Sequence, residues 1–125
     1  MNKKYNDETI TNWGNTDSYK EFTIKTKDYS IQKYNEINEN MNYIFKQFSI
    51  LLNENKEYDH VNVQNLVKML KEYISENLYT CSNEMLLNLG SLYVTDERFK
   101  KNIDINCEGN AEYIHAAIKF FCNNT

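Results

Sequence analysis

Arginine is nearly absent from this chain, which contains Arg98 as the single arginine among 14 basic residues and has a net charge of −4. A DNA-binding domain normally gathers lysine and arginine on one face, where they neutralise the phosphates. Here the lysines are scattered singly or in pairs along the sequence. We therefore expect no direct binding of nucleic acid by this chain.

The sequence also lacks the short motifs that accompany catalysis or metal binding. It has no glycine-rich phosphate loop, no GxSxG nucleophile elbow and no HExxH metal helix. Its three cysteines form no CxxC pair, and neither histidine stands at a zinc-ligand interval from them. The sequence therefore predicts no metal, no cofactor and no enzymatic activity.

Proline is absent, glycine occurs only three times, and no stretch approaches the ~20 apolar residues that would cross a bilayer. The first four residues, Met-Asn-Lys-Lys, are followed by polar residues, which is not the pattern of a secretory signal. We expect a cytoplasmic protein that makes no membrane contact and keeps its odd number of cysteines reduced.

Apolar residues recur at three- and four-residue steps over most of the chain, whereas no window alternates for long enough to predict a strand. A chain of this length fits one domain, so the pattern predicts an all-α bundle of about six helices over residues 13–125, preceded by a polar tail over residues 1–12. The clearest helix begins after a Ser30 N-cap. Its inward positions are expected to be Ile31, Tyr34, Ile37, Met41, Ile44, Phe45, Phe48, Leu51 and Leu52.

Five further helices are expected, and most of them begin next to a residue that suits an N-cap. Thr16 precedes the first of these, Ser82 and Thr95 precede two others, and either Asp59 or Asn62 begins the helix after the 53–57 loop. The expected helices cover about residues 17–26, 62–80, 83–93, 96–102 and 111–122.

Cys81 is the residue most open to a chemical role, because it stands immediately before the expected helix start at Ser82. Unpaired backbone N–H groups and the positive end of the helix dipole stabilise a thiolate there, which would make this thiol more nucleophilic than Cys107 or Cys122. The alternative is that Cys81 is a small buried apolar residue. Leu78 and Met85, three and four residues away, are candidates to lie beside it.

Trp13 and Tyr19 are aromatic residues near the polar N-terminal end, where little core is available to bury them. Such rings can close over a flat apolar ligand. They can equally anchor the first helix to the bundle, and the residues alone favour neither interpretation.

Several blocks of the chain, in order and with similar spacing, resemble the TipAS antibiotic-recognition domain family. The resemblance covers about residues 13–120. Its main blocks are WGNTDSY (13–19), YTCSNEM (79–85), LGSLYVTDERF (89–99) and AEYIHAAI (111–118), with KDYS (27–30) and NID (102–104) between them. Separate blocks in one register are more specific than any one of them alone.

The resemblance implies a globin-like bundle with a wide ligand cleft that binds thiopeptide antibiotics and other bulky hydrophobic drugs. In the family a cysteine adds to a dehydroamino acid of the thiopeptide, and Cys81 stands at the matching position. The domain usually follows the DNA-binding half of MerR-type transcription activators, and it also occurs alone as a drug-sequestering protein. The ligand-site residues expected here are Cys81, Leu78, Met85, Trp13, Tyr19 and Tyr79.

The chain departs from the family pattern at positions around the expected cleft. Leu70, Leu78 and Leu86 stand where the family often has histidine, and Thr80 replaces an acidic residue before the cysteine. These changes would make the cleft more apolar. The sequence thus favours a non-catalytic antibiotic-binding module, acting as a sensor or by sequestration. A domain whose cleft binds a partner helix is the main alternative, and a thiol enzyme using Cys81 is a third.

Overall fold

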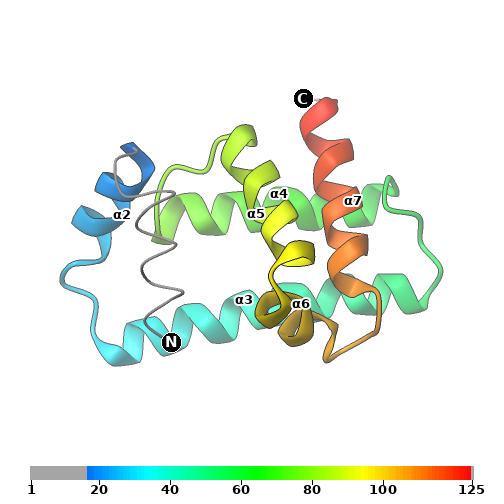
Figure 1. The fold of residues 1–125 in the computed structure, drawn as a ribbon, viewed down its shortest axis with the longest axis horizontal. Coiled ribbons are helices and arrows are strands. Elements are labelled where there is room, and N and C mark those ends of the chain that lie inside the picture. Colours follow the sequence, from blue (N-terminus) through cyan, green and yellow to red (C-terminus); the bar gives the residue numbers. More distant parts are fainter. Residues whose placement is uncertain (1–16, 125) are drawn as a thin grey trace.

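The computed structural model describes residues 17–124, and this part of the chain forms six helices and no strand (Figure 1). This confirms the predicted all-α fold. Trp13, Thr16 and the expected tail over residues 1–12 lie outside the described residues. The helices are α2 (Asp17–Thr26), α3 (Ile31–Asn53), α4 (Val61–Asn77), α5 (Asn83–Thr95), α6 (Glu97–Asp104) and α7 (Asn110–Asn123).

Two long helices, α3 and α4, run antiparallel and form the base of the bundle (Figure 1). Helices α5 and α7 pack closely against each other, and α7 also packs on both α3 and α4. The short α6 joins α5 to α7, while α2 lies at the far end of the bundle, beside the start of α3 (Figure 1). Helix α2 therefore packs on the bundle less extensively than the other helices do.

The core lies where α3, α4, α5 and α7 meet. Its members recur at helical spacing on one face of each helix, and each fully buried large aliphatic or aromatic side chain stabilises the fold by roughly 1.5–3 kcal/mol. The side chains with no exposed surface include Phe48, Val63, Val67, Leu70, Leu86, Ile114, Ala117 and Ile118.

Two predicted N-caps are confirmed and two are wrong. The hydroxyls of Ser30 and Ser82 accept from backbone N–H groups three residues later, at 3.0 and 3.1 Å. Helix α4 is capped by His60, whose Nδ1 accepts from the backbone N–H of Asn62 at 3.1 Å, rather than by Asp59 or Asn62. A neutral imidazole nitrogen can serve this role, although histidine is not a typical N-cap.

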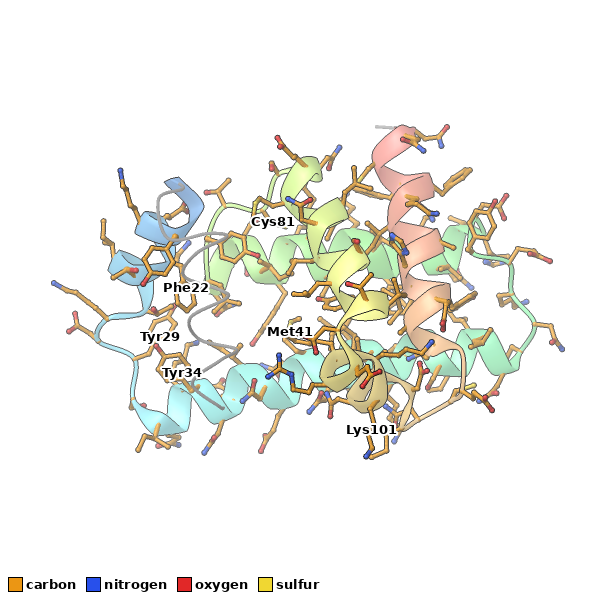
Figure 2. The ribbon with its side chains drawn as sticks, viewed as in Figure 1. Phe22, Tyr29, Tyr34, Met41, Cys81 and Lys101 are labelled. Carbon is orange, nitrogen blue, oxygen red and sulfur yellow. The ribbon has the colours of Figure 1, made fainter. Side chains whose placement is uncertain are left out.

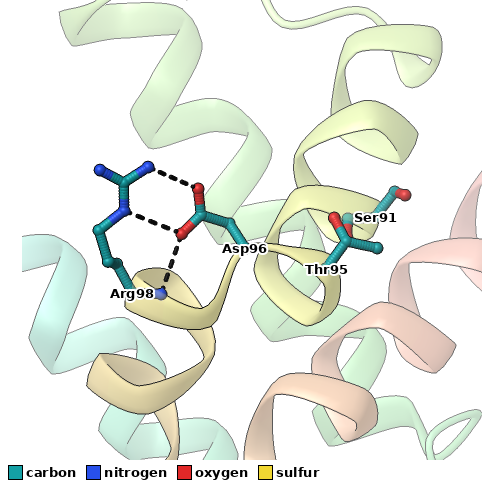
Figure 3. A network of polar contacts seen from close by, with 4 residues as sticks. All are labelled: Ser91, Thr95, Asp96 and Arg98. Carbon is teal, nitrogen blue, oxygen red and sulfur yellow. Dashed lines mark hydrogen bonds and ion pairs between the residues drawn. The ribbon is translucent and has the colours of Figure 1, made fainter. Parts of the chain in front are cut away.

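The expected start of α6 at Thr95 is also wrong, because α5 continues through Thr95 and the chain bends at Asp96 (Figure 3). The Asp96 carboxylate accepts from the backbone N–H of Arg98 at 2.9 Å and pairs with the Arg98 guanidinium at 3.0 Å. The Thr95 hydroxyl instead donates to the carbonyl of Ser91, one turn back in α5. A carboxylate at a helix start is favoured by the helix dipole, which explains why Asp96 caps α6.

Two residues that were expected to face the core, Ile31 and Tyr34, are exposed, and so is the apolar Ile24 of α2. Ile31 is 81% exposed, Tyr34 is 39% exposed and Ile24 of α2 is 72% exposed. They lie at the end of the molecule where α3 extends past α5 and α7, near α2 and the end of α4 (Figure 1). Helical spacing predicts which face of a helix is apolar, but whether another helix covers that face depends on the tertiary arrangement. Within residues 17–124, no helix is long and apolar enough to span a bilayer.

Candidate ligand-binding site

The segment between α4 and α5 holds three of the six expected site residues, and Met85 follows in the first turn of α5. Local hydrogen bonds fix the path of this segment. Helix α4 ends with the backbone N–H groups of Leu78 and Tyr79 both donating to the carbonyl of Ile74. The backbone N–H of Cys81 then donates to the hydroxyl of Ser75 at 3.0 Å. The chain enters α5 through the Ser82 cap, so Cys81 occupies a short non-helical stretch between two fixed helix ends.

Cys81 is buried, with only 2% of its surface exposed, and it belongs to the hydrophobic core. Burial raises the pKa of its thiol to about 11, and the positive charge of Lys71 opposes this rise only in part. Of the two interpretations, the structure agrees with a small buried apolar residue and not with an exposed thiol favoured as a thiolate. Desolvation of the charged form outweighs the favourable position at a helix start.

Leu78, Tyr79 and Met85 pack with Cys81 on the same core, so the structure brings these four predicted residues together. Tyr79 is 5% exposed, and burial raises the pKa of its phenol well above the ordinary value. Leu78 and Met85 are half-buried. Leu78 and Met85 therefore expose apolar surface beside the buried Tyr79.

Helix α2 is attached to this segment mainly by polar contacts. The Glu21 carboxylate accepts from both the backbone N–H and the hydroxyl of Thr80, each at 2.7 Å. Lys25 donates to the carbonyl of Ser75 at 2.8 Å. Just after α2, the Tyr29 hydroxyl donates to the carbonyl of Asn77 at 2.7 Å. The α2 region thereby satisfies carbonyls at the end of α4 that have no partner within that helix.

The apolar side of α2 is small. Thr26 is its only buried residue among those whose side chains are described, whereas Tyr19 and Phe22 are half-buried. Phe22 of α2 and Met41 of α3 lie on the faces of these helices that look into the bundle, and both pack against the core (Figure 2). Tyr19, the predicted aromatic contact, thus stands on the same helix as Glu21 and Phe22.

A shallow hollow lies on the outer face of α4, beside the end of α7. It reaches the Cys81 segment through Ser75, and four of its six lining residues carry a charge. Its lining residues are Lys68, Lys71, Glu72, Ser75, Glu76 and Phe121.

Comparison with known proteins decides the family. The model of the TipAS antibiotic-recognition domain matches residues 5–121. The chain belongs to this family. The TipAS domain is thus made of the helices that the apolar periodicity predicts. The segment around Cys81 connects two of its central helices, α4 and α5.

The curated relatives are transcription regulators. The chain is 32% identical to the HTH-type transcriptional activator TipA of Streptomyces coelicolor, and equally to that of Streptomyces lividans, over 92% of this chain and 46% of the relative. It is 26% identical to the HTH-type transcriptional activator mta of Bacillus subtilis, over 80% of this chain and 38% of the relative. The chain thus spans about half the length, or less, of the relatives it matches.

A solved structure of TipAS from Streptomyces lividans in complex with nosiheptide, described as part of a thiopeptide antibiotic multidrug resistance system, has the same fold. It superposes with a TM-score of 0.86 at 30% identity, covering 97% of this chain and 85% of that chain. The all-α class predicted from the sequence and the globin-like bundle implied by the resemblance are both confirmed.

Sequence reasoning missed Glu21, Lys25 and Tyr29 as residues that adjoin the site. Their partners lie 59, 50 and 48 residues away along the chain, and no local pattern indicates such pairing. It also assigned Leu70 and Leu86 to the cleft, whereas both are fully buried and belong to the core. Only Leu78, among the three leucines at these positions, keeps part of its surface accessible.

Proposed function

We propose that this domain binds bulky, largely apolar antibiotics of the thiopeptide class, and that it does so without catalysing a reaction. The observation that carries the proposal is the fold similarity over 97% of the chain to a TipAS domain that holds nosiheptide. The domain would act as the drug sensor of a transcription regulator or as a cytoplasmic sequestering protein, because its full-length relatives are HTH-type activators.

The apolar residues around the α4–α5 connection support this ligand class. Leu78 and Met85 present hydrophobic surface next to the buried Tyr79, and Tyr19 with Phe22 adds aromatic surface from α2. Pockets for large ligands are generally lined by such residues with few polar groups among them. Trp13 belongs to the proposal as well, because it precedes α2 within the block that resembles the family.

We propose reversible binding as the primary event, with Cys81 forming part of the site wall. Covalent capture would join the Cys81 sulfur to the β-carbon of a ligand dehydroalanine and place a proton on the α-carbon, so that the full ligand mass is retained. A thiol with a pKa of about 11 and 2% exposure is a weak nucleophile at neutral pH. This addition therefore requires ligand binding to open the Cys81 segment first.

The test is calorimetric titration of the protein with nosiheptide, followed by intact-mass analysis of the same samples. We expect saturable binding at a 1:1 ratio with a dissociation constant of about 1 μM or lower, corresponding to roughly −8 kcal/mol. Cys81→Ala should keep this reversible binding and should remove any adduct. Cys107→Ala is the matched control, because Cys107 lies by Asn53 at the end of α3 and should change neither result.

Absence of saturable binding in the wild-type protein would overturn the proposal. In that case the alternative function, a domain whose cleft binds a partner helix, becomes the better explanation. An adduct that forms equally in Cys81→Ala would leave antibiotic binding intact but would contradict the role given to Cys81.

A further inference from the structure

Two of the three cysteines lie near each other, where the end of α7 passes the start of α5. The Cys81 sulfur lies 3.7 Å from the carbonyl oxygen of Ser82, and the Cys122 sulfur lies 3.5 Å from the carbonyl oxygen of Asn83. The two thiols thus lie next to consecutive carbonyls of the same helix start, although they are 41 positions apart in the sequence. Cys107 is not part of this group, because its sulfur lies 3.3 Å from Asn53 Oδ1.

Lys71 is the charged group that faces both thiols. Its ammonium donates to Asn83 Oδ1 at 2.8 Å and lies 5.8 Å from the centre of the Phe121 ring, next to Cys122. Burial raises the pKa of both the Cys81 and the Cys122 thiols, and the charge of Lys71 opposes the rise at each. A cation held at this position stabilises the thiolate form of whichever of the two thiols ionises first.

The two cysteines differ in access. Cys122 is half-buried, whereas Cys81 is 2% exposed. The hollow on the outer face of α4 is lined by Lys71, Ser75 and Phe121, so it opens beside the Cys122 neighbourhood. A small solute such as hydrogen peroxide would meet Cys122 before it meets Cys81.

We infer that Cys81 and Cys122 form a dithiol site that peroxide oxidises to an internal disulfide. In the first step the Cys122 thiolate attacks one peroxide oxygen, the O–O bond breaks and hydroxide leaves, which gives a sulfenic acid. In the second step the Cys81 sulfur displaces water from the Cys122 sulfur, and the S–S bond forms. The overall change converts two thiols and one hydrogen peroxide into one disulfide and two waters.

The bond requires the sulfurs to approach to about 2.05 Å, so the side chains must rotate toward each other. Cys81 lies in the non-helical residues 80–82, where the backbone can adjust without breaking a helix. The bond would tie the start of α5 to the end of α7. If the proposed antibiotic site is correct, it would also consume the Cys81 thiol that covalent capture needs.

The site can be tested without any antibiotic, so its failure is separable from failure of the proposed function. Native protein is treated with hydrogen peroxide, and the remaining thiols are alkylated in denaturant without a reducing agent. Trypsin places the three cysteines in separate peptides, residues 72–98, 102–119 and 120–125. We expect the first and third to be joined and lighter by about 2 Da, while Cys107 remains alkylated.

The joined peptides should separate again with dithiothreitol. Cys107→Ser is the matched control and should form the same bond, whereas Cys122→Ser should lose it and leave Cys81 alkylated. The inference is overturned if peroxide drives Cys122 to sulfinic acid without joining it to Cys81, or if the bond that forms involves Cys107. Because the wild-type peptides decide the question, a poorly folding variant would not prevent the test.

Discussion

At Cys81 two physical effects oppose each other. The start of a helix stabilises an anion, typically by 0.3–1 kcal/mol at an exposed position, while burial penalises it. With 2% exposure and a pKa of about 11, burial determines the outcome. The helix-start effect can be recognised in the sequence from the adjacent Ser82 cap. The burial of Cys81 cannot, because it depends on helices that are distant in the chain.

We therefore expect Cys81 to be the slowest of the three cysteines to react with iodoacetamide in the ligand-free protein. A pKa of about 11 leaves roughly one thiol in 10,000 ionised at pH 7, against a few in 100 for an ordinary cysteine. Cys107 and Cys122 are more accessible and should be alkylated first. Timed alkylation with peptide mass spectrometry measures the three rates in one sample.

Denatured protein provides the control for this experiment, because all three cysteines should then react at similar rates. Alkylation of native Cys81 as fast as Cys107 would mean that the thiol is not held in the core. It would also restore the interpretation of Cys81 as a nucleophile at an exposed helix start.

Other single residues also show that interactions between near neighbours can be predicted from the sequence, whereas interactions between distant residues cannot. Ser30 and Ser82 were predicted as N-caps because the cap bond closes within three residues. His60 was missed because an imidazole cap is uncommon, and Asp96 because it follows a threonine that suits the same role. The buried Asn110, whose amide donates to the carbonyl of Phe45 at 3.0 Å, pairs across 65 residues and has no local signal.

At the scale of helices, α2 differs from the rest because polar contacts, rather than apolar burial, attach it to the bundle. Glu21 is central to this attachment, since it accepts two hydrogen bonds from Thr80. The sequence of residues 17–26 contains few apolar residues, which agrees with this weak apolar anchoring. It could not predict that the anchor would be the residue immediately before Cys81.

Removing this anchor should loosen α2 while the bundle stays folded. In Glu21→Ala we expect the backbone amide of Thr80 to exchange with solvent at least several-fold faster, because its acceptor is gone. Glu36→Ala is the matched control, since Glu36 is an exposed carboxylate on α3. Amide exchange followed by NMR reports both Thr80 and the core; unchanged Thr80 exchange in Glu21→Ala would contradict the proposed attachment.

Acid should have the same effect as this substitution. The hydrogen bonds from Thr80 lower the pKa of Glu21 below its usual 4.5. A lowered pKa in the folded state contributes stability that is present above the usual value and is lost as the pH falls through the lowered value. The protection of Thr80 should therefore persist at neutral pH and fall below about pH 4.5 in the wild-type protein, with no such pH dependence in Glu21→Ala.

At the scale of the molecule, apolar periodicity was sufficient to predict the core helices, because α3, α4, α5 and α7 each bury a stripe of apolar residues. The exceptions, Ile24, Ile31 and Tyr34, are exposed at the end of the molecule where α3 extends past α5 and α7. Several blocks of sequence, in the same order and with similar spacing, were sufficient to identify the family. The tertiary packing that buries Cys81 and places Cys122 beside the start of α5 could not be predicted, because it depends on contacts between distant helices.

The central claim is that a thiopeptide binds between α2 and the α4–α5 connection, and hydrogen exchange with and without nosiheptide tests it most directly. Our account predicts that the ligand slows exchange chiefly in residues 17–26 and 78–85, because α2 has the least buried surface to protect it beforehand. The interior of α7, which carries Ile114, Ala117 and Ile118 in the core, should change little. Saturating nosiheptide that leaves both segments unchanged, or protects only a distant surface, would contradict the account.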